Sequence, residues 1–212
     1  MSFPVSSTHQ IPEVVAPIAS LMSSYSAHWA LCGGWAVDSW LGEHTREHGD
    51  VDVSVFVQDQ RALFNHLRGW QLVPHDPHVP DDSNELWDGR GLGTPGHLHC
   101  RPDAGKPVPG GALLADQGFT LDVMLDDRDG DQWVLWREPR ISLPLQEAVP
   151  TSPWGLPTVA PEVLLFFKAR DMRRRDKLDF EALLPHLAPA RRAWLRDALG
   201  LAGHPWLTRL AG

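Results

Sequence analysis

Two aspartates, Asp50 and Asp52, stand one residue apart at the start of a valine-rich stretch, 51–57. In a strand, side chains at i and i+2 project from the same face, so these two carboxylates lie side by side while the valines point the other way. Two carboxylates held this close repel one another unless a cation lies between them. Oxygen ligands suit Mg²⁺ or Mn²⁺. The spacing therefore predicts a divalent metal site.

Asp122 is the best candidate for a third carboxylate. It lies in the alternating stretch 119–125, where an unpaired charge is costly to bury. If that strand lies beside 51–57, three carboxylates converge on one face. The alternative is that Asp122 points to solvent from a half-exposed strand.

A glycine pair, Gly33–Gly34, lies between an apolar stretch and a short helix predicted over 35–41. Glycine adopts positive φ and lets a ligand approach the backbone, and a helix start offers N–H groups to phosphate oxygens. The alternative is a tight strand-to-helix turn with no ligand.

The segments GGWAVD (33–38) and TREHGDVD (45–52) resemble the nucleotidyltransferase motif of the DNA polymerase beta superfamily, and most closely its small aminoglycoside and lincosamide branch. The resemblance implies that Gly33 and Gly34 hold a nucleoside triphosphate, ATP above all, and that Asp50 and Asp52 bind Mg²⁺. Asp122 then completes the metal site or acts as the base toward an acceptor hydroxyl. Members of the superfamily often have serine at the second position of this turn. This chain has Gly34 there, so it lacks a side-chain hydroxyl that could contact phosphate.

The expected fold is α+β, with a small mixed β-sheet nucleotidyltransferase core flanked by helices over 1–145 and a helical C-terminal region over 146–212. Alternation and turn residues predict strands over 28–32, 51–57, 70–73, 85–87, 98–101, 119–125 and 132–136, with a hairpin turn over 126–131. Helical spacing predicts helices over 11–24, 35–41, 60–67, 162–172, 177–187 and 190–199. The Pro-, Gly- and Asp-rich segment 74–111 is expected to be a loop-rich excursion at the sheet edge that shapes the substrate site.

A triphosphate needs basic partners. Arg46 could reach a phosphate or pair with Asp50 or Glu47, and the sequence leaves both interpretations open. Lys168 is the better candidate in the C-terminal part, because its helix carries a buried apolar stripe beside it. Asp176 and Asp179 are expected to pair with the arginines at 173–175 or to cap the next helix.

His97 and His99 would share one strand face, but a zinc site needs further ligands, and Cys100 points to the opposite face. His48 is expected to be structural beside the aspartates. Two cysteines are too few for a disulfide framework, which fits a reduced, cytoplasmic protein. We expect no signal peptide, because residues 1–15 lack a basic flank and an apolar core, and we expect no membrane-spanning helix, because no apolar run is long enough.

The net charge of −8 argues against a broad nucleic-acid surface. The sequence predicts transfer of a nucleoside monophosphate to the hydroxyl of a small acceptor, with acidic residues such as Glu85 and Asp88, together with Asp81 and Asp82, available to complement an aminoglycoside's ammonium groups. The alternatives are a nucleotidyltransferase acting on tRNA or a protein, and a non-catalytic nucleotide-binding relative. Nothing in the sequence indicates an oligomeric state.

Overall fold

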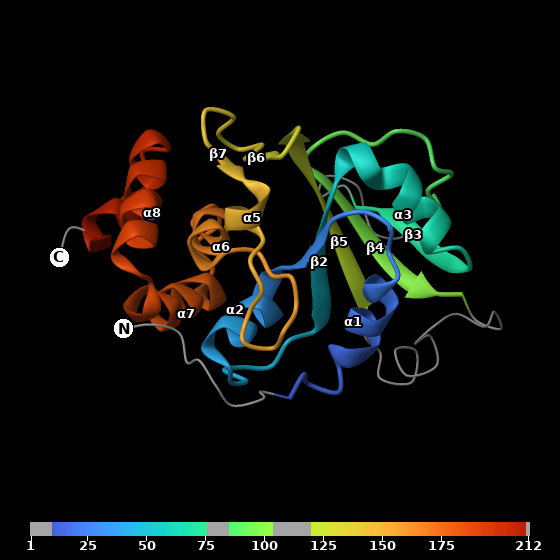
Figure 1. Cartoon of the computed structure of the whole chain (residues 1–212), viewed down its shortest axis with the longest axis horizontal. Coiled ribbons are helices and arrows are strands. Elements are labelled where there is room, and N and C mark those ends of the chain that lie inside the picture. The colour runs from blue at the N-terminus through green and yellow to red at the C-terminus, as the bar shows by residue number, and fades with distance from the viewer. Residues whose placement is uncertain (1–9, 76–84, 104–119, 211–212) are drawn as a thin grey trace.

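The computed structural model describes residues 10–75, 85–103 and 120–210. Its sheet has the strand order β1-β2-β5-β4-β3, in which β2 and β5 are parallel and the other neighbours are antiparallel. Two short strands, β6 and β7, extend it from the far end of β5 (Figure 1). The strands are β1 (Trp29–Leu31), β2 (Asp50–Phe56), β3 (Trp70–Pro74), β4 (Gly96–Pro102), β5 (Thr120–Asp129), β6 (Gln132–Val134) and β7 (Ser142–Pro144). The predicted α+β class is confirmed.

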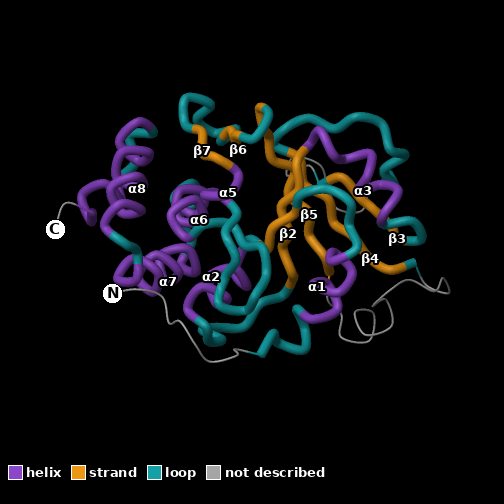
Figure 2. The backbone as a smooth tube through the Cα atoms, viewed as in Figure 1, coloured by secondary structure: helices purple, strands orange, loops and turns teal. Residues whose placement is uncertain are grey.

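Helices pack around this sheet, and the C-terminal helices α6, α7 and α8 gather at the end of the molecule away from α3 and β3 (Figure 2). The helices are α1 (Ala16–Ser23), α2 (Gly33–Leu41), α3 (Gln60–His66), α5 (Leu145–Ala148), α6 (Pro161–Lys168), α7 (Arg174–Leu183) and α8 (Pro189–Leu201). Short 3₁₀ turns follow β2, α7 and α8 at Val57–Asp59, Leu184–His186 and Pro205–Leu210. Among the described residues, none of the helices has the length and apolar character that a membrane crossing requires.

The central strands place one face in the core and leave the other for polar groups. Val51, Val53 and Val55 are fully buried on β2, as are their β5 register partners at 121, 123 and 125. The alternate positions of β2 and β5 carry Asp52 and Asp122. Strand alternation therefore separates an apolar face from a carboxylate-bearing face.

Several predicted element boundaries are wrong, for identifiable reasons. The first helix begins at Ala16 rather than residue 11, because Pro17 is tolerated only in a helix's first turn. The helix predicted over 177–187 begins at Arg174 and ends at Leu183, just before Pro185.

The hairpin turn predicted over 126–131 is present but shorter, because β5 continues to Asp129 and a turn at residues 130–131 leads into β6, which pairs with it. The segment 85–87 is not a strand; Trp87 instead donates one backbone hydrogen bond to the Leu72 carbonyl and buries its ring.

The segment predicted as an excursion at the sheet edge contributes an interior strand. β4 lies between β5 and β3 and pairs with both. The stretches 76–84 and 104–111 of that segment lie outside the described residues.

The described parts of the two predicted regions are in direct contact. The Trp40 indole on α2 donates to the Val159 carbonyl at 2.8 Å, and the Leu31 amide donates to the Pro157 carbonyl at 2.8 Å. α2 also packs against α6 and α7. The boundary at residue 145 stays a prediction.

Candidate active site

Three carboxylates meet on the polar face of the parallel pair β2–β5. Asp52 is in register with Asp122, and Asp50 lies two residues before Asp52 on the same face. One oxygen from each of the three side chains lies within 4.8 Å of the others. The strand pairing on which the sequence argument depended is present, and the role of these residues in binding metal stays a prediction.

The environments of these carboxylates differ. Burial, followed by the charges of Asp50 and Asp122, raises the pKa of Asp52 to about 7, although Lys168 and His97 act in the opposite direction. Carboxylates that lie this close repel one another. A hard divalent cation bound among their oxygens offsets that repulsion.

Asp122 has a lowered pKa. Its burial acts to raise the pKa, but hydrogen bonds with His97 and His99 outweigh that effect. The His97 Nε2 lies 3.2 Å from Asp122 Oδ2, and the His99 Nδ1 lies 2.8 Å from Oδ1. A carboxylate has about four lone-pair positions, so these contacts leave Asp122 able to bind a cation as well.

The glycine pair opens α2 directly against the carboxylates. Gly33 has φ +65°, and a Cβ there would lie 1.8 Å from Asp52 Oδ2. A Cβ on Gly34 would lie 2.2 Å from His48 Nδ1 and 2.8 Å from Arg46 Nη2. Both positions therefore require glycine, the first for conformation and space and the second for space. The helix begins at Gly33, two residues earlier than predicted.

Arg46 and Lys168 both form ion pairs with Asp179, which the sequence had predicted to pair with the arginines at 173–175 or to cap a helix. Arg46 donates from Nε to Asp179 Oδ1 at 3.2 Å and from Nη2 to Asp179 Oδ2 at 3.2 Å. Lys168 Nζ lies 2.7 Å from Asp179 Oδ2. The pairing of Arg46 with Asp50 or Glu47 is therefore wrong in this structure, although its Nη1 donates to the Glu47 backbone carbonyl.

Asp176 and Asp179 have different partners. Asp176 accepts hydrogen bonds from the Arg173 amide and side chain at the start of α7, as predicted. Asp179 is 2% exposed, and its pKa is lowered because Lys168 and Arg46 outweigh the effect of burial. Its predicted pairing with the arginines at 173–175 is wrong.

A hydrogen-bonded chain that supports the glycine turn was not predicted from the sequence. The fully buried Asp38 on α2 accepts from His48 Nε2 at 2.7 Å and from the Thr45 hydroxyl. Arg46 Nη1 then donates to His48 Nδ1 at 2.9 Å. His48 is structural, as predicted, but it binds Asp38 rather than Asp50 or Asp52. An acidic residue in the middle of a short apolar helix was the available signal for Asp38.

Known proteins resemble this chain in part of its sequence and in its fold. Residues 14–72 match the family model described as aminoglycoside-2''-adenylyltransferase. That range includes the glycine pair and the Asp50–Asp52 pair but ends before Asp122. A comparison with curated protein sequences gave no match.

Solved structures of antibiotic-modifying enzymes share the fold. Lincosamide antibiotic adenylyltransferase LnuA, bound to lincomycin, is 16% identical with a TM-score of 0.53, covering 84% of this chain and 99% of its own. The solution structure of the antibiotic-resistance factor ANT(2'')-Ia is 14% identical with a TM-score of 0.56, covering 90% and 91%. ANT(2'')-Ia in complex with adenylyl-2''-tobramycin is 13% identical with a TM-score of 0.56, covering 88% and 95%. The expected resemblance is thus confirmed: this chain is similar in sequence over residues 14–72, and in fold over most of its length, to the aminoglycoside and lincosamide nucleotidyltransferases.

Proposed function

We propose that this protein transfers a nucleoside monophosphate from a nucleoside triphosphate, ATP above all, to a hydroxyl of a small molecule of the aminoglycoside or lincosamide kind. Pyrophosphate leaves in the reaction. The observation that carries the proposal is the meeting of Asp50, Asp52 and Asp122 within 4.8 Å on neighbouring parallel strands. The similarity to antibiotic adenylyltransferases supports the same reaction class.

The donor set fits Mg²⁺ or Mn²⁺, because all three side chains offer carboxylate oxygens. Asp50, Asp52 and Asp122 would hold the metal. Bound there, it supplies charge neutralisation at the phosphates and lowers the pKa of an acceptor hydroxyl.

The remaining residues of the site position the triphosphate and balance its charge. Gly33 and Gly34 let Asp52, His48 and Arg46 lie directly against the start of α2, and the helix start favours an anion. Lys168 and Arg46 supply positive charge beside this turn. Both side chains form ion pairs with the buried Asp179, which fixes their orientation.

Asp122 is the candidate base toward the acceptor hydroxyl, or a further metal ligand. Its lowered pKa keeps it ionised at neutral pH, which either role requires. Substrate positioning and charge stabilisation would provide most of the rate increase.

The alternatives can be weighed against the same observations. A non-catalytic nucleotide-binding relative predicts an Asp122 that stays apart from the other two aspartates, and the 4.8 Å cluster counts against it. A tRNA substrate predicts a basic surface, and the net charge of −8 counts against that.

The acidic complement expected for an aminoglycoside is only partly described. Asp81 and Asp82 lie outside the described residues, while Glu85 and Asp88 are exposed. Asp88 already pairs with Arg90 at 2.5 Å. The acceptor class therefore rests on the similarity to the antibiotic-modifying enzymes.

The test is incubation with ATP labelled at the α-phosphate, Mg²⁺, and a panel of aminoglycosides, lincosamides and tRNA, followed by separation of labelled products and measurement of pyrophosphate. We expect label on one antibiotic class. Asp52→Asn should lower the rate by about 100-fold or more, because it removes a charge from the site where transition-state charge is balanced. Asp129→Asn changes an exposed carboxylate on the neighbouring strand β5 and is the matched control.

An Asp52→Asn protein that folds and transfers nucleotide at the wild-type rate would refute the metal assignment. Binding of ATP without any product would favour the non-catalytic alternative, and label on tRNA would favour the RNA-directed one.

A further inference from the structure

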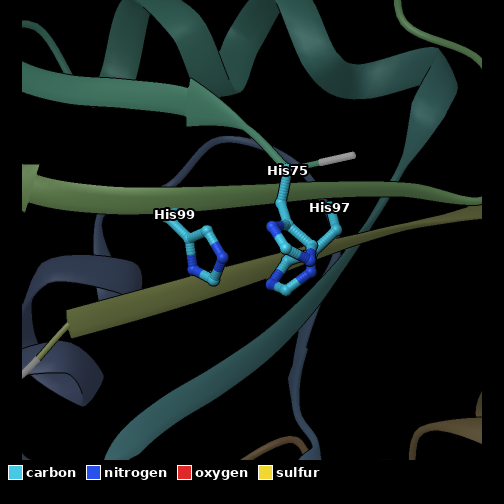
Figure 3. Close-up of side chains that lie close together, drawn as sticks. All are labelled: His75, His97 and His99. Atoms are coloured by element: carbon cyan, nitrogen blue, oxygen red, sulfur yellow. The ribbon is translucent and has the colours of Figure 1, made fainter. Parts of the chain in front are cut away.

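Three histidines gather on the carboxylate-bearing face, one strand beyond Asp122. His97 and His99 lie two residues apart on β4, so they share a face, while Leu98 and Cys100 are fully buried on the other. The His75 amide donates to the His97 carbonyl at 2.8 Å, which places His75 opposite His97 just past the end of β3. Figure 3 shows the three rings on the same side of β4.

The rings are close enough to share one ion. Their centroids lie 4.5 Å apart for His97 and His99, 4.9 Å for His75 and His97, and 4.7 Å for His75 and His99. One nitrogen from each ring lies within 4.8 Å of the others. All three residues are only partly buried, so an ion from solvent can reach them.

Asp122 contacts two of these rings. His97 faces it through Nε2 and His99 through Nδ1. Each contact uses one ring nitrogen, which leaves Nδ1 of His97 and Nε2 of His99 as the nitrogens that could bind a metal. A carboxylate behind a metal-binding histidine is the usual support of such ligands.

We propose that His75, His97 and His99 form a binding site for a transition-metal ion of the Zn²⁺ class, separate from the site of Asp50 and Asp52. Imidazole nitrogen suits Zn²⁺, Co²⁺ and Ni²⁺, whereas Mg²⁺ prefers oxygen. Three histidines leave a fourth position of a tetrahedral ion for water or another ligand. Cys100 does not take part, because it is buried on the opposite face.

A second group of possible ligands, Asp38, His44 and His48, is a poorer candidate. His48 uses both ring nitrogens, one with Asp38 and one with Arg46, so it presents no lone pair. Asp38 is fully buried and also accepts from Thr45. His44 stacks on Trp35 at 5.1 Å. These contacts indicate a structural role for the group rather than a metal site.

The test is calorimetric titration of the full chain with Zn²⁺ in the presence of millimolar Mg²⁺, which occupies oxygen sites without competing for imidazole. We expect one Zn²⁺ per chain. The visible absorption of bound Co²⁺ then reports whether the coordination is tetrahedral. Neither measurement uses a nucleotide or an acceptor, so failure here leaves the proposed nucleotidyl transfer untouched.

Variants locate the ion. His75→Ala removes a ligand and keeps His97 and His99, the two histidines that hydrogen-bond Asp122. It should weaken Zn²⁺ binding by about 10-fold or more, since even residues that support metal ligands contribute that much. His75→Ala/His99→Ala should abolish binding. His28→Ala, which changes an exposed histidine elsewhere, and Asp52→Asn should both bind like the wild type. Circular dichroism checks that each variant is folded.

Absence of Zn²⁺ binding to the folded wild type would overturn the proposal. So would binding that survives His75→Ala/His99→Ala but is lost in His44→Ala, which would place the ion at the other cluster, or in Asp52→Asn, which would place it at the carboxylates.

Discussion

Replacing Gly33 by alanine tests the close approach of the glycine turn to the carboxylates. Gly33 has φ +65°, and the left-handed conformation costs an alanine about 1–2 kcal/mol. The added Cβ would also stand 1.8 Å from Asp52 Oδ2, 2.4 Å from its Cγ and 2.8 Å from its Cβ. Relief requires the carboxylate or the turn to move by more than an ångström.

The expected loss follows from that displacement. Misplacement of a reacting group by about 1 Å can cost roughly 100-fold in rate. We therefore expect Gly33→Ala to lower nucleotidyl transfer at least about 100-fold and to lose the Mg²⁺-dependent part of ATP binding, with an unfolding free energy reduced by about 2 kcal/mol or more. Urea unfolding, ATP calorimetry and the labelled-transfer assay measure the three effects.

Gly130→Ala separates conformational strain from the clash. Gly130 has φ +57°, in the turn after β5, and nothing within 4 Å would meet its Cβ. It should lose about 1–2 kcal/mol of stability and keep its transfer rate. If Gly33→Ala matches Gly130→Ala in both rate and stability, the contact between the turn and Asp52 is not what constrains position 33.

Two further perturbations address buried charges. Lys168→Met removes one of two cations from the buried Asp179 while Arg46 remains, so urea unfolding should show a loss of about 1–3 kcal/mol, and an unchanged stability would mean that the lysine pairing contributes nothing. Asp126 has a pKa raised to about 6, mainly by burial, so its ionisation opposes folding as pH rises from about 4 through 6. Asp126→Asn should therefore match the wild type in stability near pH 4 and exceed it by up to about 3 kcal/mol above pH 7, and a difference that is constant across that range would contradict this origin.

The parts of the site that the sequence predicted are those with a local signature. The alternation of valine and aspartate sets both the strand and its polar face, so Asp50 and Asp52 could be placed side by side from spacing alone. Asp122 was identifiable because a charge in the middle of an apolar strand needs a partner. Gly33 and Gly34 were identifiable because paired glycines between a strand and a helix mark a conformation that other residues avoid.

The ion pairs could not be predicted, because their partners are far apart along the chain. Arg46 and Asp179 are separated by 133 residues, and nothing near either one specifies the other. Their contact depends on how α7 packs against α2. Sequence proximity instead suggested Asp50 and Glu47 for Arg46, and the arginines at 173–175 for Asp179.

The histidines illustrate a different limit. Their shared strand face was evident from the His-Leu-His spacing, but their relation to Asp122 depends on strand order. β4 lies between β5 and β3, which puts His99 directly opposite Asp122 and His75 opposite His97. The sequence predicted an excursion at the sheet edge for this segment, and that placement does not bring His75 beside His97 and His99.

Packing of the hydrophobic core determines the positions of the carboxylates and the histidines. A slip of one residue in β5 would turn Asp122 into the core and bring Leu121 and Val123 to the polar face. Both of those side chains are fully excluded from solvent, so that register would expose apolar surface and bury a charge together. The same reasoning on β4 keeps Leu98 inside and its flanking histidines beside Asp122. Apolar residues that touch no substrate therefore align the carboxylates and imidazoles across three strands, and polar substitutions among them should disturb both candidate metal sites at once.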